Sequence, residues 1–313
     1  SRCWRRWPSS NLQPMRLLAA DFGALEATLQ SRREQVDAAL RTLVVAGQAP
    51  SVLAAVEDSL HAPGKRLRPI LALLVAEVLR GDPESVVPAA CAIEMVHTAS
   101  LILDDLPCMD DAALRRGRPT CHVAHGEASA ILAAFALQNR AFEILGQGWP
   151  GGPDAAVRSG LARDLARAIG LDGMIAGQSK DLAMTDRPLD FQTLEFIHSR
   201  KTGALFIASA ELGAAAARAA PAERAAVGSY AKNLGLAFQI VDDLIDAVGA
   251  SAEAGKDVGK DLKKTTFVSF SGVDGARQLA EELIVASVDA LAGFGAKAQP
   301  LRDLARYVVT RRR

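Results

Sequence analysis

Residues 86–106 read VVPAACAIEMVHTASLILDDL, and this stretch decides the fold class. It is long and largely apolar, so we expect a helix at the centre of the protein. The helix ends in two adjacent carboxylates, Asp104 and Asp105. Pro107 then interrupts the regular helical hydrogen bonding and lets Asp110 turn back toward them. Several carboxylates in an apolar setting are costly unless a cation compensates, so this end of the helix predicts a metal site.

The composition favours helix over sheet along the rest of the chain. Of the 313 residues, 50% are hydrophobic and only 5% are aromatic. Ala and Leu lose little entropy in a helix, whereas strands prefer aromatic and β-branched residues. We see no strand alternation, repeat or linker, so we expect one all-α domain over residues 15–313. Its helices are expected over 25–46, 68–80, 86–106, 127–146, 154–182, 190–218, 222–248, 273–293 and from near 300.

Charge, cysteines and hydropathy exclude several classes of protein. Lys plus Arg equals Asp plus Glu at 36 each, so no strong field favours nucleic acid or a membrane surface. The four cysteines form no C-x-x-C pair, so we expect reduced thiols and a cytoplasmic protein. No uninterrupted apolar run reaches the roughly 18–20 residues of a membrane span. Residues 1–14 are expected to form a disordered extension, with an Arg- and Ser-rich transit peptide as the alternative.

A second acidic cluster lies in FQIVDDLID, residues 238–246. Gln239, Asp242, Asp243 and Asp246 have the spacing i, i+3, i+4 and i+7, which places them on one stripe of a helix. One acidic cluster also fits a helix cap or a solvated edge. Two such clusters on two core helices predict a magnesium site inside a helical bundle.

Basic segments accompany both clusters. They read GKRLRP at 64–69, LRRGRP at 114–119, and GKDVGKD at 255–261 followed by KKTT at 263–266. Arginine and lysine suit diphosphate oxygens. Each segment alone also fits a solvated loop. Together with the carboxylates they predict a ligand that binds both metal and cationic side chains, as a diphosphate does.

Five motifs together resemble the trans-isoprenyl diphosphate synthase (polyprenyl synthetase) family. They are GKRxRP, DDxxxxD with RRG, GQxxD, KT and FQxxDDxxD, in the family's order over residues 63–268. Residues 94–120 are especially similar to bacterial geranylgeranyl diphosphate synthases. The resemblance implies an isoprenoid synthase type of bundle with a central active-site cavity. It also implies Mg²⁺ as cofactor, with about three ions when an allylic diphosphate is bound.

The resemblance carries roles over to individual residues. The metal ligands would be Asp104, Asp110 and Asp242, supported by Asp105, Asp243 and Asp246. The allylic diphosphate would be held by Arg115, Lys201 and Lys256. Isopentenyl diphosphate would be held by Lys65, Arg68, His97 and Arg116, although a lone histidine on an apolar helix is more often structural. The reaction centre would be lined by Thr202, Gln239, Gln178 and Asp181. The candidate catalytic residues are Lys201, Thr202, Gln239, Asp104 and Asp242.

The implied reaction is a magnesium-dependent, head-to-tail condensation of isopentenyl diphosphate with an allylic diphosphate by a homodimer. Ala99 and Ser100 are small and precede Asp104 on the helix, with Ala99 about 7.5 Å along the axis. They predict a deep pocket and a C20 product, geranylgeranyl diphosphate. Phe135 is expected in the core, with the pocket floor as the alternative. A farnesyl (C15) synthase and a non-catalytic partner subunit are the alternative functions.

Overall fold

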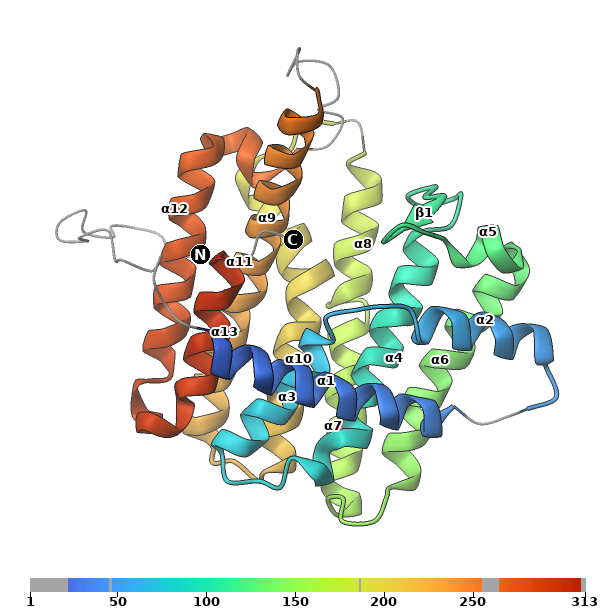
Figure 1. The fold of residues 1–313 in the computed structure, drawn as a ribbon, viewed down its shortest axis with the longest axis vertical. Coiled ribbons are helices and arrows are strands. Elements are labelled where there is room, and N and C mark those ends of the chain that lie inside the picture. Colours follow the sequence, from blue (N-terminus) through green and yellow to red (C-terminus); the bar gives the residue numbers. More distant parts are fainter. Residues whose placement is uncertain (1–21, 45–46, 186, 255–264, 311–313) are drawn as a thin grey trace.

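The computed structural model describes residues 22–44, 47–185, 187–254 and 265–310, which form a bundle of helices (Figure 1). The expected extension 1–14 and Lys256 lie outside the described residues. The elements in chain order are α1 (Gly23–Leu43), α2 (Pro50–Leu60), α3 (Leu67–Val78), η2 (Glu84–Val86), α4 (Val87–Asp104), β1 (Leu114–Arg115), β2 (Arg118–Pro119), α5 (Cys121–His125), α6 (Glu127–Gln147), α7 (Ala155–Ile169), α8 (Met174–Ala183), α9 (Phe191–His198), η3 (Ser199–Gly203), α10 (Ala204–Ala216), α11 (Pro221–Ala254), α12 (Phe267–Ala290), η4 (Ala292–Ala298) and α13 (Gln299–Thr310).

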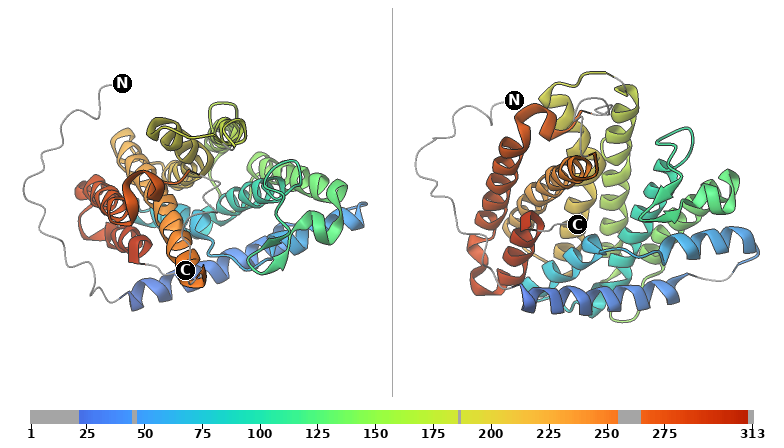
Figure 2. Two further views of the ribbon diagram at one scale, coloured as in Figure 1. Left: turned by 90° about the horizontal axis from the view of Figure 1, so that it is seen from above. Right: turned by 45° about the horizontal axis from the view of Figure 1, so that its top comes forward.

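The long helices run roughly parallel to the long axis of the molecule, while α1 and α2 lie across them (Figures 1 and 2). Two groups of buried apolar side chains make up the core. One joins α1, α2, α4, α6 and α7, and the other joins α11, α12 and α13. Helices α3 and α10 contribute to both groups, because both are apolar on nearly every side, and α1 adds Leu25 to the second group. The all-α fold expected from composition is therefore confirmed, with α3 and α10 between the two halves.

Several expected boundaries were wrong. The helix expected over 154–182 is interrupted between α7 and α8, where Gly170 and Gly173 leave helical geometry. The segment 190–218 is helical throughout its middle but passes through one π-helical turn, η3. Helix α2 was not expected, and β1 pairs with β2 as a two-residue antiparallel hairpin around Gly117, whose φ of 76° suits a tight turn.

Two other expectations concern the apolar helices. The segment Glu84–Asp104 is long and apolar enough to cross a membrane by mean hydropathy, although it has no uninterrupted run of that length. In the structure 72% of its apolar window is buried inside the protein, as expected of a core helix of the bundle. The expected core position of Phe135 was wrong, because its side chain is 58% exposed. Helix α6 buries Ala130, Ala133 and Leu137 instead, and Phe135 projects from another face.

Candidate active site

The first aspartate cluster lies where α4 ends. Asp104 is the last residue of α4, and the following loop folds back so that the backbone N–H of Asp110 donates to the carbonyl of Asp104 at 2.9 Å. Burial raises the pKa of the Asp104 carboxyl, an effect that Lys201 opposes and Asp110 reinforces. An ionised Asp104 is therefore costly in the protein alone, as expected of a carboxylate that awaits a cation.

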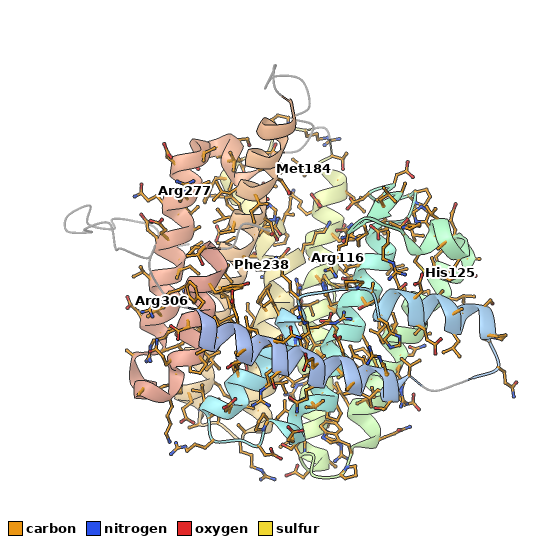
Figure 3. The ribbon with its side chains drawn as sticks, in the orientation of Figure 1. Arg116, His125, Met184, Phe238, Arg277 and Arg306 are labelled. Atoms are coloured by element: carbon orange, nitrogen blue, oxygen red, sulfur yellow. The ribbon has the colours of Figure 1, made fainter. Side chains whose placement is uncertain are left out.

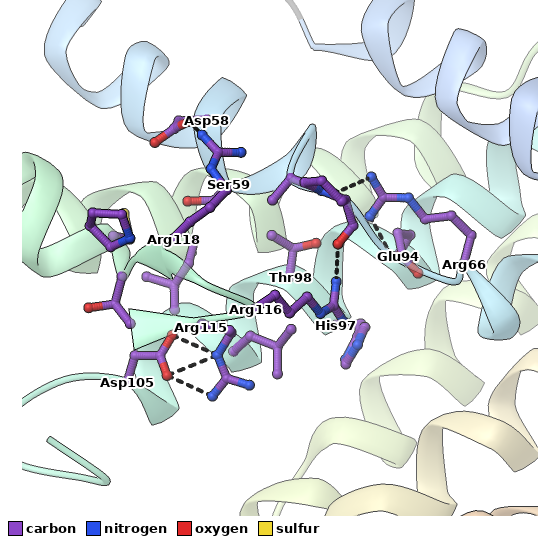
Figure 4. A pocket seen from close by; sticks show the side chains of 17 residues that line it. Asp58, Ser59, Arg66, Glu94, His97, Thr98, Asp105, Arg115, Arg116 and Arg118 are labelled. Carbon is purple, nitrogen blue, oxygen red and sulfur yellow. Dashed lines mark hydrogen bonds and ion pairs between the residues drawn. The ribbon is translucent and has the colours of Figure 1, made fainter. Parts of the chain in front are cut away.

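Asp105 faces a different neighbour. Its side chain is buried, and both of its oxygens accept from Nε of Arg115, at 2.9 and 2.8 Å. Nη2 of Arg115 adds a third contact of 2.6 Å (Figure 4). These hydrogen bonds raise the pKa of the Arg115 guanidinium. A planar guanidinium paired in this way has a fixed orientation, so Asp105 holds Arg115 in place at the site.

The second cluster lies on α11. Asp242 lines the large cavity described below, whereas Asp246 is exposed. Asp243 is buried and accepts from the Gln239 side chain at 3.1 Å and from the backbone N–H of Phe267 at 3.1 Å. Burial raises the pKa of Asp243, while these two donors oppose the shift. Asp243 thus ties α11 to the start of α12 and orients Gln239.

Lys201 reaches from the π-helical turn η3 toward α8 and the first aspartate cluster. Its Nζ lies 3.0 Å from Asp181 Oδ2 on α8 and 3.6 Å from Asp104 Oδ2 on α4. Burial disfavours the charged amine, but the two carboxylates outweigh this and raise the pKa of Lys201. The next residue, Thr202, donates to the side-chain oxygen of Gln239 at 3.0 Å. Single π-helical turns often occur at functional sites.

Gln178 joins α8 to the first aspartate loop. Its amide nitrogen lies 3.6 Å from the sulfur of Met109. Its carbonyl oxygen is buried and has no hydrogen-bond partner among the described residues, as is also true of the Arg158 Nε atom away from the site. The structure therefore places Gln178 beside the first aspartate loop and, in the described part of the chain, gives no direct contact between it and the lining of the cavity.

Cationic side chains line the same cavity as Asp104 and Asp242. Arg68 Nη1 lies 3.2 Å from His97 Nε2, and the guanidinium lies 4.8 Å above the ring centre of Phe206. Burial lowers the pKa of Arg68 to about 10, so it stays charged at neutral pH. Burial, followed by the charges of Arg68 and Arg116, lowers the pKa of His97 well below its usual value. His97 is therefore neutral, and its Nε2 accepts the hydrogen bond from Arg68.

Arg66 is a structural residue whose role was not predicted from the sequence. It has a left-handed backbone, with φ of 49°, and its side chain is buried. It donates to Glu94 at 2.8 Å (Figure 4) and to Asp37 at 2.8 Å, and to the carbonyls of Leu60 and Ala62 at 2.8 and 3.1 Å. The only sequence signal for this role was the density of basic residues after Pro63 and Gly64. Residues so close together in the chain cannot all face one ligand, so at least one of them was bound to have a structural role.

A cavity of about 680 Å³ brings these groups together. Its lining includes Lys65, Arg68, His97, Arg115, Arg116, Asp104, Lys201, Thr202, Gln239 and Asp242. Apolar walls come from Leu205 and Phe238, and Figure 3 places Arg116 and Phe238 near the middle of the bundle. Most of the residues predicted from the sequence therefore meet in one cavity. Asp105, Asp243 and Asp181 contact its lining residues, Gln178 contacts Met109 in the first aspartate loop, and Asp110 and Asp246 are exposed.

The comparisons with known proteins agree with this geometry. The sequence profile of the polyprenyl synthetase family matches residues 49–285. Geranylgeranyl pyrophosphate synthase 9, chloroplastic, from Arabidopsis thaliana is 42% identical, over 90% of this chain and 79% of that protein. A dimethylallyltranstransferase from Fischerella ambigua is also 42% identical, over 90% and 82% of the two chains. The crystal structure of an FPP/GFPP synthase from Zymomonas mobilis superimposes with a TM-score of 0.82 at 38% identity, covering 91% of this chain and 99% of that one.

The fold and the cavity define a helical enzyme of the isoprenyl diphosphate synthase type. The chain belongs to the polyprenyl synthetase family and is a prenyltransferase.

Proposed function

We propose that this enzyme condenses isopentenyl diphosphate with an allylic diphosphate, in a magnesium-dependent reaction that ends at geranylgeranyl diphosphate. The observation that carries the proposal is the shared cavity, which carboxylates from α4 and α11 line together with arginines and lysines from four other segments. Carboxylates bind Mg²⁺, and phosphate oxygens bind both Mg²⁺ and the arginine and lysine side chains. A magnesium-bound diphosphate therefore uses both kinds of side chain in this cavity. A substrate without phosphate leaves the cations uncompensated.

The donors fit magnesium. Asp104 and Asp242 line one cavity from two helices and offer carboxylate oxygens, the ligands that Mg²⁺ prefers. Within the described ranges, no three His, Cys, Asp or Glu side chains could hold a metal by themselves. Mg²⁺ commonly takes few protein carboxylates and completes its shell with water and substrate phosphates. Asp104, Asp110 and Asp242 would hold it, with Asp105, Asp243 and Asp246 in support, and it would supply positive charge for the leaving diphosphate.

The two substrates would occupy different parts of the cavity. Arg115 and Lys201 would bind the allylic diphosphate, with Lys256 from outside the described residues. Lys65, Arg68, His97 and Arg116 would bind isopentenyl diphosphate. Neutral His97 donates from Nδ1 while its Nε2 accepts from Arg68, so it can bind a phosphate oxygen without taking a proton.

The reaction follows from this placement. The bond between C1 of the allylic substrate and its diphosphate oxygen breaks, and the diphosphate leaves with the electron pair. Arg115 and Lys201 stabilise the charge that develops on it. The double bond of isopentenyl diphosphate attacks C1 to form the new carbon–carbon bond, and the departing diphosphate takes the proton that is lost. Thr202, Gln239, Gln178 and Asp181 orient the reacting groups, while Leu205 and Phe238 exclude water from the carbocation.

Product length is proposed from the small residues on α4. Ser100 lines the cavity and Ala99 is buried next to it, so neither of these two positions places a ring there. The C20 product is supported by the Arabidopsis relative, which is named a geranylgeranyl pyrophosphate synthase. The C15 alternative draws on the name of the Zymomonas synthase. The non-catalytic subunit is less favoured because both aspartate motifs are intact.

The test is an assay with labelled isopentenyl diphosphate, MgCl₂ and separate C5, C10 and C15 allylic partners, with products dephosphorylated and sized by chromatography. A dominant C20 alcohol supports the proposal, whereas a stop at C15 favours the farnesyl alternative. A folded protein that yields no magnesium-dependent product from any starter refutes the catalytic role and favours the partner-subunit alternative.

The assembly and the compartment are further parts of the proposal. Ile131, Leu132 and Phe135 on α6 are 37, 53 and 58% exposed, and an apolar face of this kind fits a homodimer. Cys91, Cys108 and Cys121 are free thiols, which fits a reducing compartment. We assign the enzyme to the cytoplasm, although the Arabidopsis relative is chloroplastic by name.

A further inference from the structure

The π-helical turn η3 carries Lys201 and Thr202 side by side, and the two residues bind to different helices. Lys201 contacts Asp181 on α8 at 3.0 Å, and Thr202 donates to Gln239 on α11 at 3.0 Å. In Figure 1 the chain leading from this turn into α10 runs between α8 and α11. The turn is therefore held from both sides, and its position decides where the Lys201 amine lies relative to Asp104.

The contact with α8 is made through Gly177. A Cβ atom at this position would lie 2.4 Å from the backbone N of Lys201, 2.9 Å from Cβ of Arg200 and 3.0 Å from its carbonyl carbon. Ordinary contacts of a Cβ atom begin at 3.4 Å, so any side chain here requires the two backbones to separate by about 1 Å. Gly177 and Asp181 are one helical turn apart on α8, so the same face supplies both the close approach and the carboxylate.

The contact with α11 also involves a glycine, Gly235, that lies close to the end of the turn and the start of α10. A Cβ atom on Gly235 would lie 3.2 Å from Cα of Gly203 and 3.2 Å from Cβ of Phe206. Gln239, the partner of Thr202, follows Gly235 by one helical turn. On each side, a glycine in close contact with the turn or the start of α10 precedes by four residues the polar group that binds the turn, and the approach is closer at Gly177 than at Gly235. A shift of the turn away from α8 therefore presses Gly203 against α11.

We infer that Gly177 and Gly235 are positioning residues that clamp the turn η3 and thereby set the distance from the Lys201 amine to Asp104 and to the allylic diphosphate. This inference rests on the proposed function, because it assumes that Lys201 binds that diphosphate. A backbone displacement of about 1 Å is enough to reduce catalysis by roughly a hundredfold when it moves a group that contacts the reacting atoms. Gly177 itself is buried and lies outside the lining of the cavity.

The main variant is Gly177→Ala, and Gly160→Ala is its matched control. Gly160 lies within α7, and a Cβ atom there would meet only the end of Arg163, at 3.8 Å. We expect Gly177→Ala to raise the KM for geranyl diphosphate at least about tenfold and to lower kcat, while the KM for isopentenyl diphosphate stays within about twofold. Gly160→Ala should match the wild-type enzyme. Equal behaviour of the two variants, or an equal rise in both KM values, overturns the inference.

A double-mutant cycle separates positioning from general damage. If Gly177 acts through Lys201, then adding Gly177→Ala to Lys201→Ala should change the KM for geranyl diphosphate less than about twofold further. The full effect of Gly177→Ala in that background contradicts the inference. Gly235→Ala, whose clash is milder, should raise the same KM about threefold. It also serves as the test if Gly177→Ala shows no cooperative unfolding transition, and an unchanged KM for Gly235→Ala then overturns the clamp.

A binding measurement distinguishes failure of this inference from failure of the proposed function. Calorimetric titration of each full-length variant with inorganic diphosphate in MgCl₂ needs no turnover. We expect Gly177→Ala to bind at least about tenfold more weakly than wild type and Gly160→Ala to bind equally well. An inactive wild-type enzyme refutes the proposed function, whereas equal diphosphate binding by wild type and Gly177→Ala refutes the clamp alone.

Discussion

Nη1 of Arg66 lies 2.8 Å from Oε1 of Glu94, and both side chains are almost entirely buried, at 4 and 6% exposed. The pair joins the loop before α3 to the middle of α4, and Asp37 on α1 accepts from Nε of the same guanidinium. Lys65 and Arg68 flank Arg66 in sequence and line the cavity. The buried pair therefore fixes the loop that presents the proposed isopentenyl diphosphate ligands.

Arg66→Met should lower the free energy of unfolding by about 3–5 kcal/mol, because it leaves Glu94 charged and buried without its partner. Urea unfolding followed by circular dichroism measures this change. Arg118→Met is the control, since the Arg118–Asp58 pair is 47 and 42% exposed and should contribute at most about 1 kcal/mol. A loss for Arg66→Met no larger than for Arg118→Met contradicts the structural role.

Asp104→Asn should separate stability from activity. Burial raises the pKa of Asp104, so its ionised form costs folding free energy at neutral pH, and the neutral amide should leave the melting temperature unchanged or higher. Synthase activity should fall by about 10²–10³, because a proposed magnesium ligand is lost. Asp274→Asn, at an exposed position on α12, is the control. Near-normal activity of Asp104→Asn at saturating MgCl₂ argues against the metal role.

The sequence predicted which polar residues share one face of a helix better than it predicted where helices end and which apolar residues are exposed. The spacing of Gln239, Asp242 and Asp243 required only a helix of normal pitch, and α11 supplies it. The break between α7 and α8 was missed because Gly170 and Gly173 are tolerated in a helical pattern, and only packing decides that they end it. The exposure of Phe135 was missed because apolar residues surround it on every side in sequence, so periodicity did not single out one face.

The partners of the charged residues could not be read from sequence at all. Asp105 and Asp104 are adjacent and chemically identical, yet one binds Arg115 and the other faces Lys201. Their directions depend on how the helix end meets the hairpin, which is a tertiary contact. The close approach of Gly177 to Lys201 likewise joins residues far apart in the chain, and no local pattern encodes it.

The unfolding free energy should fall as the pH is lowered through about 6.5. His97 has a pKa well below 6.5 in the folded protein, through burial and the charges of Arg68, Arg116, Arg115 and Arg66, but a normal one when unfolded. The unfolded state therefore takes up the proton first, and stability is lost toward acid by about 1 kcal/mol per pH unit. His97→Asn removes this contribution, so urea unfolding at pH 7.5, 6.5 and 5.5 should show a shallower dependence. Identical pH dependence in both proteins contradicts a neutral, buried His97.

The apolar face of α6 leads to a prediction about assembly. Leu132 is 53% exposed and lies beside Ile131 and near Phe135 on the same helix. Leu132→Glu places a charge on this face and should shift a dimer toward monomer, because a buried unpaired carboxylate opposes association. Sedimentation equilibrium measures the shift. Glu127→Gln, an exposed polar substitution in the first turn of α6, should leave the mass unchanged. A monomeric wild-type protein at micromolar concentration contradicts the homodimer directly.

Ser100→Phe should shorten the product. Ser100 lines the cavity one helical turn before Asp104, and its hydroxyl donates to the carbonyl of His97 at 2.7 Å. A phenylalanine ring projecting there fills the path that a growing chain would take along α4, so elongation should stop at C15 or earlier. Chromatography of the dephosphorylated alcohols gives the ratio of C15 to C20. Ser229→Phe, an exposed site on α11, should retain the wild-type ratio and control for the added bulk. If an active Ser100→Phe enzyme still makes the C20 product, the growing chain does not run along this face of α4, because a phenylalanine ring in its path would block elongation.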